Sequence, residues 1–284
     1  MENTKAPNYR WHAINSLQDR ASQSKLWGLG VFISMTIAFA LSSILLVNAI
    51  RYTETNLLMV EKQPLLISIL ANGILVSLYL ALLASISVSR ELDKGTLETL
   101  LYGPVDELTY ILGSFIAHVK VFSLTLLGAL IWSNLCVWLL NLSFRLDILG
   151  LLLASLFMAA ELIAFGLFSA IWGGKTRNAL INFILIVLFL GGVQIADFIV
   201  SGLVQIQTST ISDPLIVIRN VLASLNSTIR WISPFSQVQR AMQALINQQT
   251  GEFILNMGLM LLECALLLVG AILLLKKKGV RGVA

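Results

Sequence analysis

Charged residues are scarce in this sequence. Asp, Glu, Lys and Arg make up only 12% of its 284 residues, whereas a soluble domain averages about 25%. Hydrophobic residues make up 57% and cluster in runs of about twenty or more, the length that crosses a bilayer. This composition excludes a soluble protein and predicts an integral membrane protein, a single transmembrane domain over residues 1–284 set in the lipid bilayer. The net charge of +4 is no sign of nucleic-acid binding, because the basic residues are distributed as membrane topology requires.

Side chains that carry enzyme chemistry are also scarce. The two histidines are His12 and His118, and the sequence contains neither a His-Glu-x-x-His nor a Gly-x-Ser-x-Gly pattern. The two cysteines, Cys136 and Cys264, fall inside apolar runs, where a free cysteine behaves as a small buried hydrophobe. We therefore expect no catalytic residue, no metal site and no disulfide.

One stretch resembles part of a nucleotide-binding loop. Gly173-Gly174-Lys175-Thr176 matches the end of the Walker A pattern, but Ser169 stands where the pattern needs its first glycine. An apolar run, not a β-strand, precedes the stretch. We therefore predict that the chain is not an enzyme and has no cofactor of its own, so that any ATP would be bound by a partner subunit.

Six apolar runs predict six transmembrane helices in an all-α fold. We place them at residues 27–50, 65–88, a run ending near 141, 148–172, 179–204 and 253–275. The fifth is expected to be interrupted at Gly191-Gly192. Residues 106–120 are expected to form a helix that rises along the membrane interface into the third span.

The segment 205–252 is less apolar than the spans and is too long for a free loop. It contains two candidate amphipathic helices, 215–225 and 235–246. We expect these short helices to lie on the outer leaflet, or to dip into it, before the sixth span.

The basic residues decide the orientation. Six spans put both termini on one side, and thirteen of the 19 Lys and Arg residues flank the spans on that side. Because cytoplasmic loops carry the excess of Lys and Arg, both termini are predicted to be cytoplasmic. We expect a multi-pass protein of the cell membrane, the cytoplasmic or inner membrane. Residues 1–26 form a polar N-terminal segment, either an interfacial helix from Tyr9 onward or an unstructured leader.

The segment between the second and third spans, residues 89–105, differs from the rest of the chain. Its first ten residues carry five charges. Thr96 is placed to act as an N-cap, and Glu98 follows in the first turn, where the helix dipole favours a negative charge. Gly103 and Pro104 end the helix. The pattern predicts a short cytoplasmic helix with an apolar side formed by Leu97, Leu100 and Leu101.

The order of residues in this segment resembles the signature of ABC-2 type ABC transporter permeases. The matching residues are Arg90-Glu91, Gly95-Thr96-Leu97-Glu98, Leu100-Leu101 and Pro104-Val105. In that family the segment is the coupling helix, which docks on a separate ATPase subunit. The resemblance implies a complex of two permease subunits, identical or different, with two ABC ATPase subunits that bind ATP. It also implies export more than import.

The resemblance further implies which side chains couple the subunits. Charged residues would fix the orientation of the short helix on the ATPase: Arg90, Glu91, Lys94 and Glu98. Leucines would fill a groove of the ATPase: Leu97, Leu100 and Leu101. The set is completed by Gly95, Thr96 and Pro104.

Three acidic residues fall inside predicted spans: Glu161, Asp197 and Glu263. A charged acid at the bilayer centre costs about 2.5–3.5 kcal/mol on insertion scales, so something must offset that cost. Two interpretations stay open. The acids belong to a polar or proton translocation path, or they are neutral carboxyls hydrogen-bonded to a neighbouring helix. Asp197 lies toward the outer end of its span, within reach of interfacial water.

These observations predict the permease subunit of an ATP-driven ABC-2 type exporter, coupled through residues 90–104 to a separate ATPase. One alternative is a secondary transporter that carries protons on Glu161 and Glu263, although spans one to three show no repeat in spans four to six. Another is a membrane scaffold of an assembly complex that transports nothing. The substrate is left open.

Overall fold

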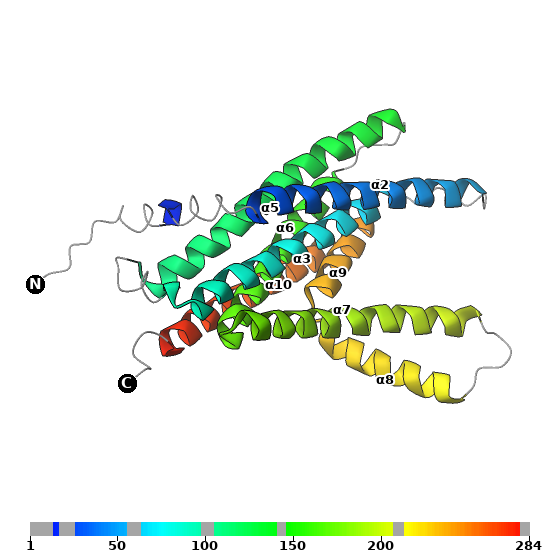
Figure 1. Cartoon of the computed structure of the whole chain (residues 1–284). Helices are drawn as coiled ribbons and strands as arrows, with labels where there is room; N and C mark the ends of the chain where they lie inside the picture. Colours follow the sequence, from blue (N-terminus) through cyan, green and yellow to red (C-terminus); the bar gives the residue numbers. More distant parts are fainter. Residues whose placement is uncertain are drawn as a thin grey trace, which may run out of the picture.

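The computed structural model describes residues 14–16, 26–55, 64–97, 105–140, 146–206 and 213–278. Every regular element in these ranges is helical. The elements are η1 (Leu26–Gly30), α2 (Val31–Thr55), α3 (Pro64–Asp93), α5 (Glu107–Leu139), α6 (Asp147–Gly173), α7 (Thr176–Ile206), α8 (Asp213–Ile229), α9 (Pro234–Ile246) and α10 (Thr250–Lys278). Figure 1 shows them as one bundle of long helices, with α8 and α9 as the shorter members.

The prediction of six spans is confirmed. Six described helices are long and apolar enough to cross a membrane: α2, α3, α5, α6, α7 and α10. Their ends lie within a few residues of the predicted boundaries for most spans. The two amphipathic segments predicted before the last span are also helical, as α8 and α9.

One local prediction is wrong, because α7 continues through Gly191-Gly192 without a break. Glycine costs up to about 1 kcal/mol in a helix in water. Inside a membrane, a broken helix would leave backbone groups without any hydrogen-bond partner, which costs more. The apolar surroundings therefore keep α7 continuous. Residues 107–120 are helical, as predicted, and form the first part of the continuous α5.

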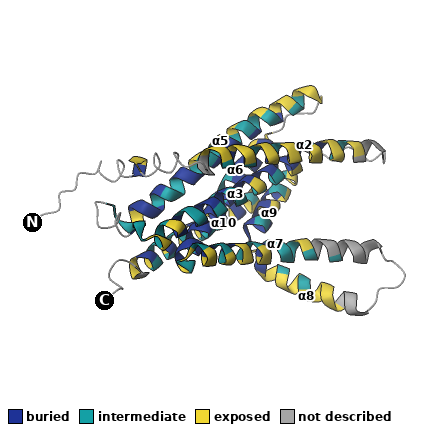
Figure 2. Ribbon diagram, in the orientation of Figure 1, coloured by how far each residue is buried: buried dark blue, intermediate teal, exposed yellow. Residues whose placement is uncertain are grey.

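The centre of the bundle is the pair α3 and α6. Over half of the most apolar window of each is buried, 56% and 61%, against at most 28% for the other four spans. Figure 2 shows the same contrast, with the buried colour concentrated on this pair and the exposed colour on the outer helices. The pair is the core on which the other four spans pack.

Small residues let α3 and α6 approach closely. A Cβ atom on Gly166 of α6 would lie 2.2 Å from the backbone oxygen of Ala81 in α3, closer than any real contact allows. One turn further along, the hydroxyls of Ser85 and Ser169 share a hydrogen bond of 3.2 Å between the same helices. Close backbone approach and interhelical hydroxyl bonds are the usual means of association inside membranes, where lipid is as apolar as leucine.

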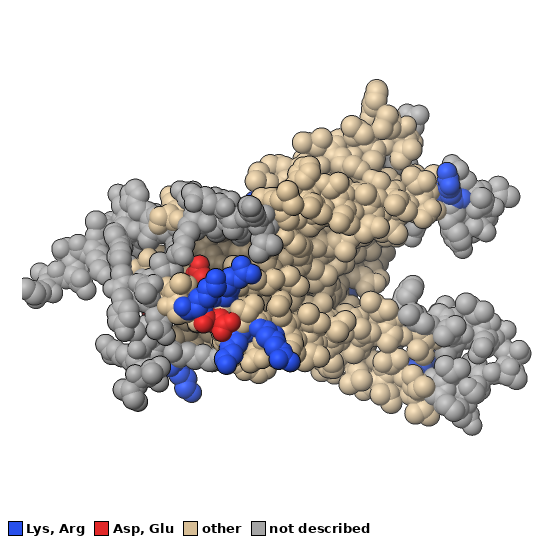
Figure 3. Space-filling view, viewed as in Figure 1, with Lys and Arg blue, Asp and Glu red and all other residues tan. Residues whose placement is uncertain are grey.

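The outer helices expose large apolar side chains. Among them are Phe32 of α2, Leu124 of α5, Leu188 of α7 and Leu266 of α10, each more than half exposed. Figure 3 shows a broad uncharged band across the middle of this face, with charges gathered at one end and few at the other. This is the surface expected of a protein surrounded by lipid.

α8 and α9 return the chain from the end of α7 toward the centre. α8 runs back beside α7 as the second arm of a hairpin (Figure 1). α9 packs on α6 and α10 and buries one side of its surface, formed by Pro234, Gln237, Val238, Ala241 and Ala244. α9 is therefore part of the bundle itself.

We predict that Gly166→Ala destabilises the protein by about 1–3 kcal/mol, because the new methyl group must push α3 and α6 apart. The matched control is Gly258→Ala, which gains the same helix propensity but places its methyl group in open space. Thermal unfolding of the detergent-purified variants compares the two. Equal melting temperatures would contradict the close packing at Gly166.

Candidate functional site

The first candidate site begins where α3 ends. Gly95 has a positive φ of 68°, the left-handed conformation that ends many helices, and its N–H bonds the carbonyl of Leu92 at 3.2 Å. The hydroxyl of Thr96 then donates to the carbonyl of Glu91 at 3.2 Å, which satisfies another free carbonyl of the last turn. Gly95 and Thr96 thus turn the chain out of α3. The amides that Thr96 was predicted to cap lie outside the described residues.

Leu97 is placed differently from the prediction. Its side chain is 2% exposed and belongs to the core cluster that includes Val88, Tyr110 and Ile111. It therefore cannot fill a groove of a partner in this conformation. The side chain of Leu97 packs inward because burial in the apolar bundle removes it from water. This packing attaches the segment to the transmembrane core.

A second anchor joins the end of α3 to the start of α5. The phenol of Tyr110 donates to the Glu91 carboxylate at 2.7 Å. At the start of α5, Asp106 acts as N-cap and accepts from the backbone N–H of Thr109 at 3.1 Å. The first bond holds the end of α3 against α5, and the second caps the start of α5. Glu98, Leu100, Leu101 and Pro104 themselves lie outside the described residues.

Both basic and acidic side chains are accessible at the C-terminal end of α3. Arg90, Asp93 and Lys94 are exposed; Asp93 accepts a long hydrogen bond, 3.5 Å, from Thr176 of α7. Arg90 and Lys94 have no carboxylate partner in the described part of the chain. The segment thus presents two free cations beside an anchored backbone, which suits a docking surface.

The second candidate site lies inside the bundle. Glu161 on α6 and Glu263 on α10 lie close enough for their carboxyl groups to interact electrostatically. The Glu161 side chain is fully buried, and neither of its carboxyl oxygens has a hydrogen-bond partner in the described structure. The two acids predicted from the sequence therefore form one site.

Gln237 of α9 completes this site and was missed by sequence reasoning. Its side-chain amide donates to Glu263 at 3.0 Å and also to the backbone carbonyl of Trp231. The signal was present, since Gln237 is a polar residue on the otherwise apolar side of α9. The third predicted acid, Asp197, belongs to α7, but its side chain lies outside the described residues.

A family model for "ABC-2 family transporter protein" matches residues 11–280, nearly the whole chain. The chain belongs to this family. No curated protein matches it. Within the ABC-2 transporter family, a chain of six apolar helices is the membrane part of the transporter and not its catalytic part. The sequence resemblance is thereby confirmed, and both candidate sites lie inside the matched region.

We call residues 90–104, which Glu91 and Leu97 attach to the bundle, the anchored segment. The ABC-2 family bears on what this segment contacts. An ABC transporter permease implies an ABC ATPase partner and a membrane setting. In the described part of the chain no group of three or more His, Cys, Asp or Glu residues is arranged to hold a metal ion. The two candidate sites differ in position, since one lies at the exposed end of α3 and the other lies inside the apolar bundle.

We predict that Tyr110→Phe loosens the α3–α5 connection of this permease. Losing the bond to Glu91 costs about 1 kcal/mol, which raises the open fraction of the segment roughly fivefold. Limited trypsin digestion at Lys94, an exposed residue, measures the opening as a cleavage rate. In the control Glu91→Gln, the amide oxygen still accepts from Tyr110, so its rate should stay near that of the wild type. Equal cleavage rates for Tyr110→Phe and the wild type would show that the Tyr110–Glu91 hydrogen bond does not stabilise the α3–α5 connection.

Proposed function

We propose that this chain is the permease subunit of an ATP-driven exporter, coupled through residues 90–104 to a separate ATPase. The observation that carries the proposal is the anchored segment in an ABC-2 family chain. Leu97 and Glu91 tie it to the core, while Arg90 and Lys94 remain free to contact a partner. The complex would contain two permease subunits and two ATPase subunits, which bind the ATP, in the cytoplasmic membrane.

The geometry supports a way to transmit force. A push on the segment by closing ATPase subunits would act on Leu97 and Glu91 at the end of α3. From there it would pass into α3 and, through the close contact at Gly166, into α6. Packed helices transmit such displacements because their interiors are dense and deform little. The positive-inside count supports a cytosolic position for this end.

We further propose that Glu161 and Glu263 belong to the translocation path. Acidic side chains inside a membrane bundle rarely face lipid. Here Glu161 of α6 is fully buried, and Glu263 of α10 accepts a hydrogen bond from Gln237 of α9. A movement of α6 relative to α10 would change the distance between the two carboxyls. Asp197, toward the outer end of α7, remains a candidate for the same path.

The acid pair also favours a second candidate function, a proton-coupled secondary transporter. Two interacting acids inside the bundle, Glu161 and Glu263, are the kind of group that a proton carrier would use. The two functions differ in their energy source. Transport by a proton-coupled carrier stops when a protonophore collapses the gradient and needs no ATPase subunit.

We predict that an ATPase subunit co-purifies with the tagged permease from native membranes in mild detergent. Lys94→Glu and Glu98→Arg should reduce its recovery roughly tenfold or more, because each brings like charges together at the interface. The control is Arg219→Glu, the same kind of change on exposed α8, and it should leave recovery unchanged.

Leu97→Asp is not a suitable variant for this experiment. It would bury a carboxylate in the core and unfold the segment whether or not a partner binds it. If no ATPase appears with the wild type, or if Lys94→Glu and Glu98→Arg recover as much as Arg219→Glu, residues 90–104 do not couple this chain to an ATPase.

A further inference from the structure

The turn between α8 and α9 brings two arginines onto one tryptophan. The guanidinium carbon of Arg240 lies 4.4 Å from the ring centroid of Trp231, and that of Arg230 lies 5.4 Å from it. A hydrogen bond of 2.7 Å from Nη2 of Arg240 to the backbone oxygen of Arg230 closes the turn. We call Arg230, Trp231 and Arg240 the arginine corner.

Neither arginine of the arginine corner forms an ion pair with a carboxylate in the described chain, and Nε of Arg240 has no hydrogen-bond partner there. Burial and the neighbouring charge of Arg230 lower the pKa of the Arg240 guanidinium, and the carboxylates of Glu252 and Glu263 act in the opposite direction. Arg230 and Trp231 are exposed. Two guanidinium groups therefore share one place, accessible at Arg230, with no carboxylate in direct contact.

Hydrogen bonds fix the depth of the arginine corner in the bundle. The amide of Gln237 donates both to the carbonyl of Trp231 and to the carboxylate of Glu263. Glu263 lies near the middle of α10, which has the length and hydropathy of a membrane span. Gln194 of α7 holds the same turn through Ser233 at 2.7 Å. The corner is thus level with the spans and does not protrude beyond them.

Charged side chains at that depth do not face lipid. They face a water-filled cavity or a bound partner, because a charge in hydrocarbon is costly. The arginine corner therefore marks a wet or occupied surface, at a level where the outer faces of the other helices are apolar.

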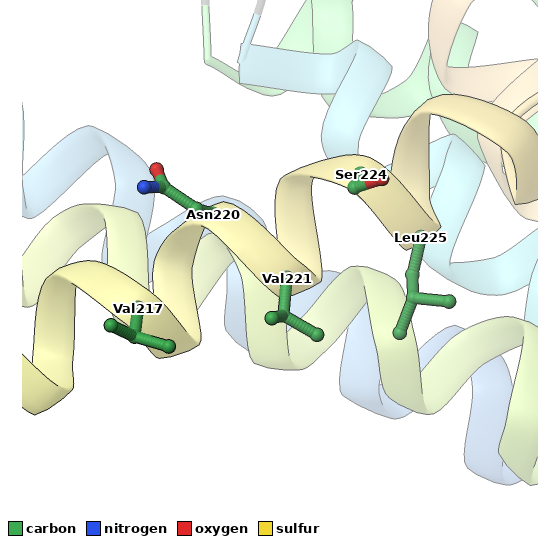
Figure 4. A pocket seen from close by; sticks show the side chains of 5 residues that line it. All are labelled: Val217, Asn220, Val221, Ser224 and Leu225. Carbon is green, nitrogen blue, oxygen red and sulfur yellow. The ribbon is translucent and has the colours of Figure 1, made fainter.

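An apolar stripe on α8 leads to the corner. Val217, Val221 and Leu225 are exposed and lie at intervals of four along one side of the helix, and they line a shallow pocket together with Asn220 and Ser224. Figure 4 shows the three apolar side chains on the same side of α8. Leu225 is the member of the stripe nearest in sequence to Arg230, so the apolar surface ends close to the two guanidinium groups.

We propose that the arginine corner and the α8 stripe bind an anionic amphiphile with a phosphate headgroup. The guanidinium groups of Arg230 and Arg240 suit a phosphate because each offers paired N–H donors to its oxygens. The acyl chains lie along Val217, Val221 and Leu225. This inference rests on the proposed function, for which it names the substrate class: a phosphate-bearing lipid or lipid-like molecule.

The test uses the purified full-length chain in neutral detergent, without ATPase or nucleotide. Phosphatidylglycerol, phosphatidylcholine and inorganic phosphate are titrated separately, and native mass spectrometry and thermal unfolding report binding. Phosphatidylglycerol should bind the wild type roughly tenfold or more tightly than phosphatidylcholine, since both carry a phosphate but the trimethylammonium group of phosphatidylcholine is repelled by the two guanidinium groups. Arg230→Gln and Arg240→Gln should each remove this preference.

The matched control is Arg219→Gln, an exposed arginine of the same α8, which should keep the preference. Arg230→Gln gives an answer even if Arg240→Gln does not fold, because no side-chain hydrogen bond of Arg230 supports the fold in the described structure. The proposal is overturned if both arginine-corner variants bind phosphatidylglycerol as well as Arg219→Gln does. It is also overturned if inorganic phosphate stabilises the wild type as strongly at equal concentration.

A second copy of the chain is the competing occupant of the corner. If Arg230→Gln converts a dimer into monomers while the preference for phosphatidylglycerol stays, the corner is a subunit interface and the proposal is wrong. Because this experiment contains no ATPase, its failure leaves the coupling through residues 90–104 untouched. A failed co-purification likewise leaves the lipid result standing.

Discussion

The backbone contact between α3 and α6 is the constraint on which the rest of the structure depends. Gly166 has no room for a side chain because the carbonyl of Ala81 occupies that space. Both candidate sites are attached to this pair, the anchored segment at the end of α3 and Glu161 in the middle of α6. The close contact thus gives the two sites a common rigid element. We expect a displacement at one end of α3 to reach the surroundings of Glu161, since dense packing transmits strain.

Some polar groups of the bundle are paired across helices. Ser85 meets Ser169 between α3 and α6, and Glu263 of α10 accepts a hydrogen bond from Gln237, whereas the carboxyl oxygens of Glu161 have no hydrogen-bond partner in the described structure. α9 is the element that supplies Gln237. Because it carries Gln237 toward the acids and Arg240 toward an accessible surface, a movement of α9 would alter both places. We therefore regard α9 as the link between the bundle centre and the arginine corner.

Hydropathy was sufficient to predict the six spans, because an apolar run of about twenty residues is rarely found outside a transmembrane helix. It failed where the fold depends on contacts between distant residues. Gly191-Gly192 looked like a break, yet apolar surroundings hold α7 together. Leu97 was predicted to contact a partner, yet its side chain is buried in the core of the bundle. Gln237 gained its role only from the packing of α9 on α10. The motif for coupling could be recognised from the sequence, whereas the anchor between Glu91 and Tyr110 could not, since it joins residues of different helices.

Residues 90–104 must face the cytosol if an ATPase is to reach them, and the exposed side of α8 must be reachable from the outside. Labelling of single cysteines with an impermeant maleimide tests this most directly, using Lys94→Cys and Asn220→Cys in a background where Cys136 and Cys264 are serine. Both positions are exposed. We predict that Asn220→Cys reacts in intact cells and that Lys94→Cys reacts only after the membrane is permeabilised. Reaction of Lys94→Cys in intact cells would place the segment outside, where no ATP-driven partner could reach it, and would contradict the account.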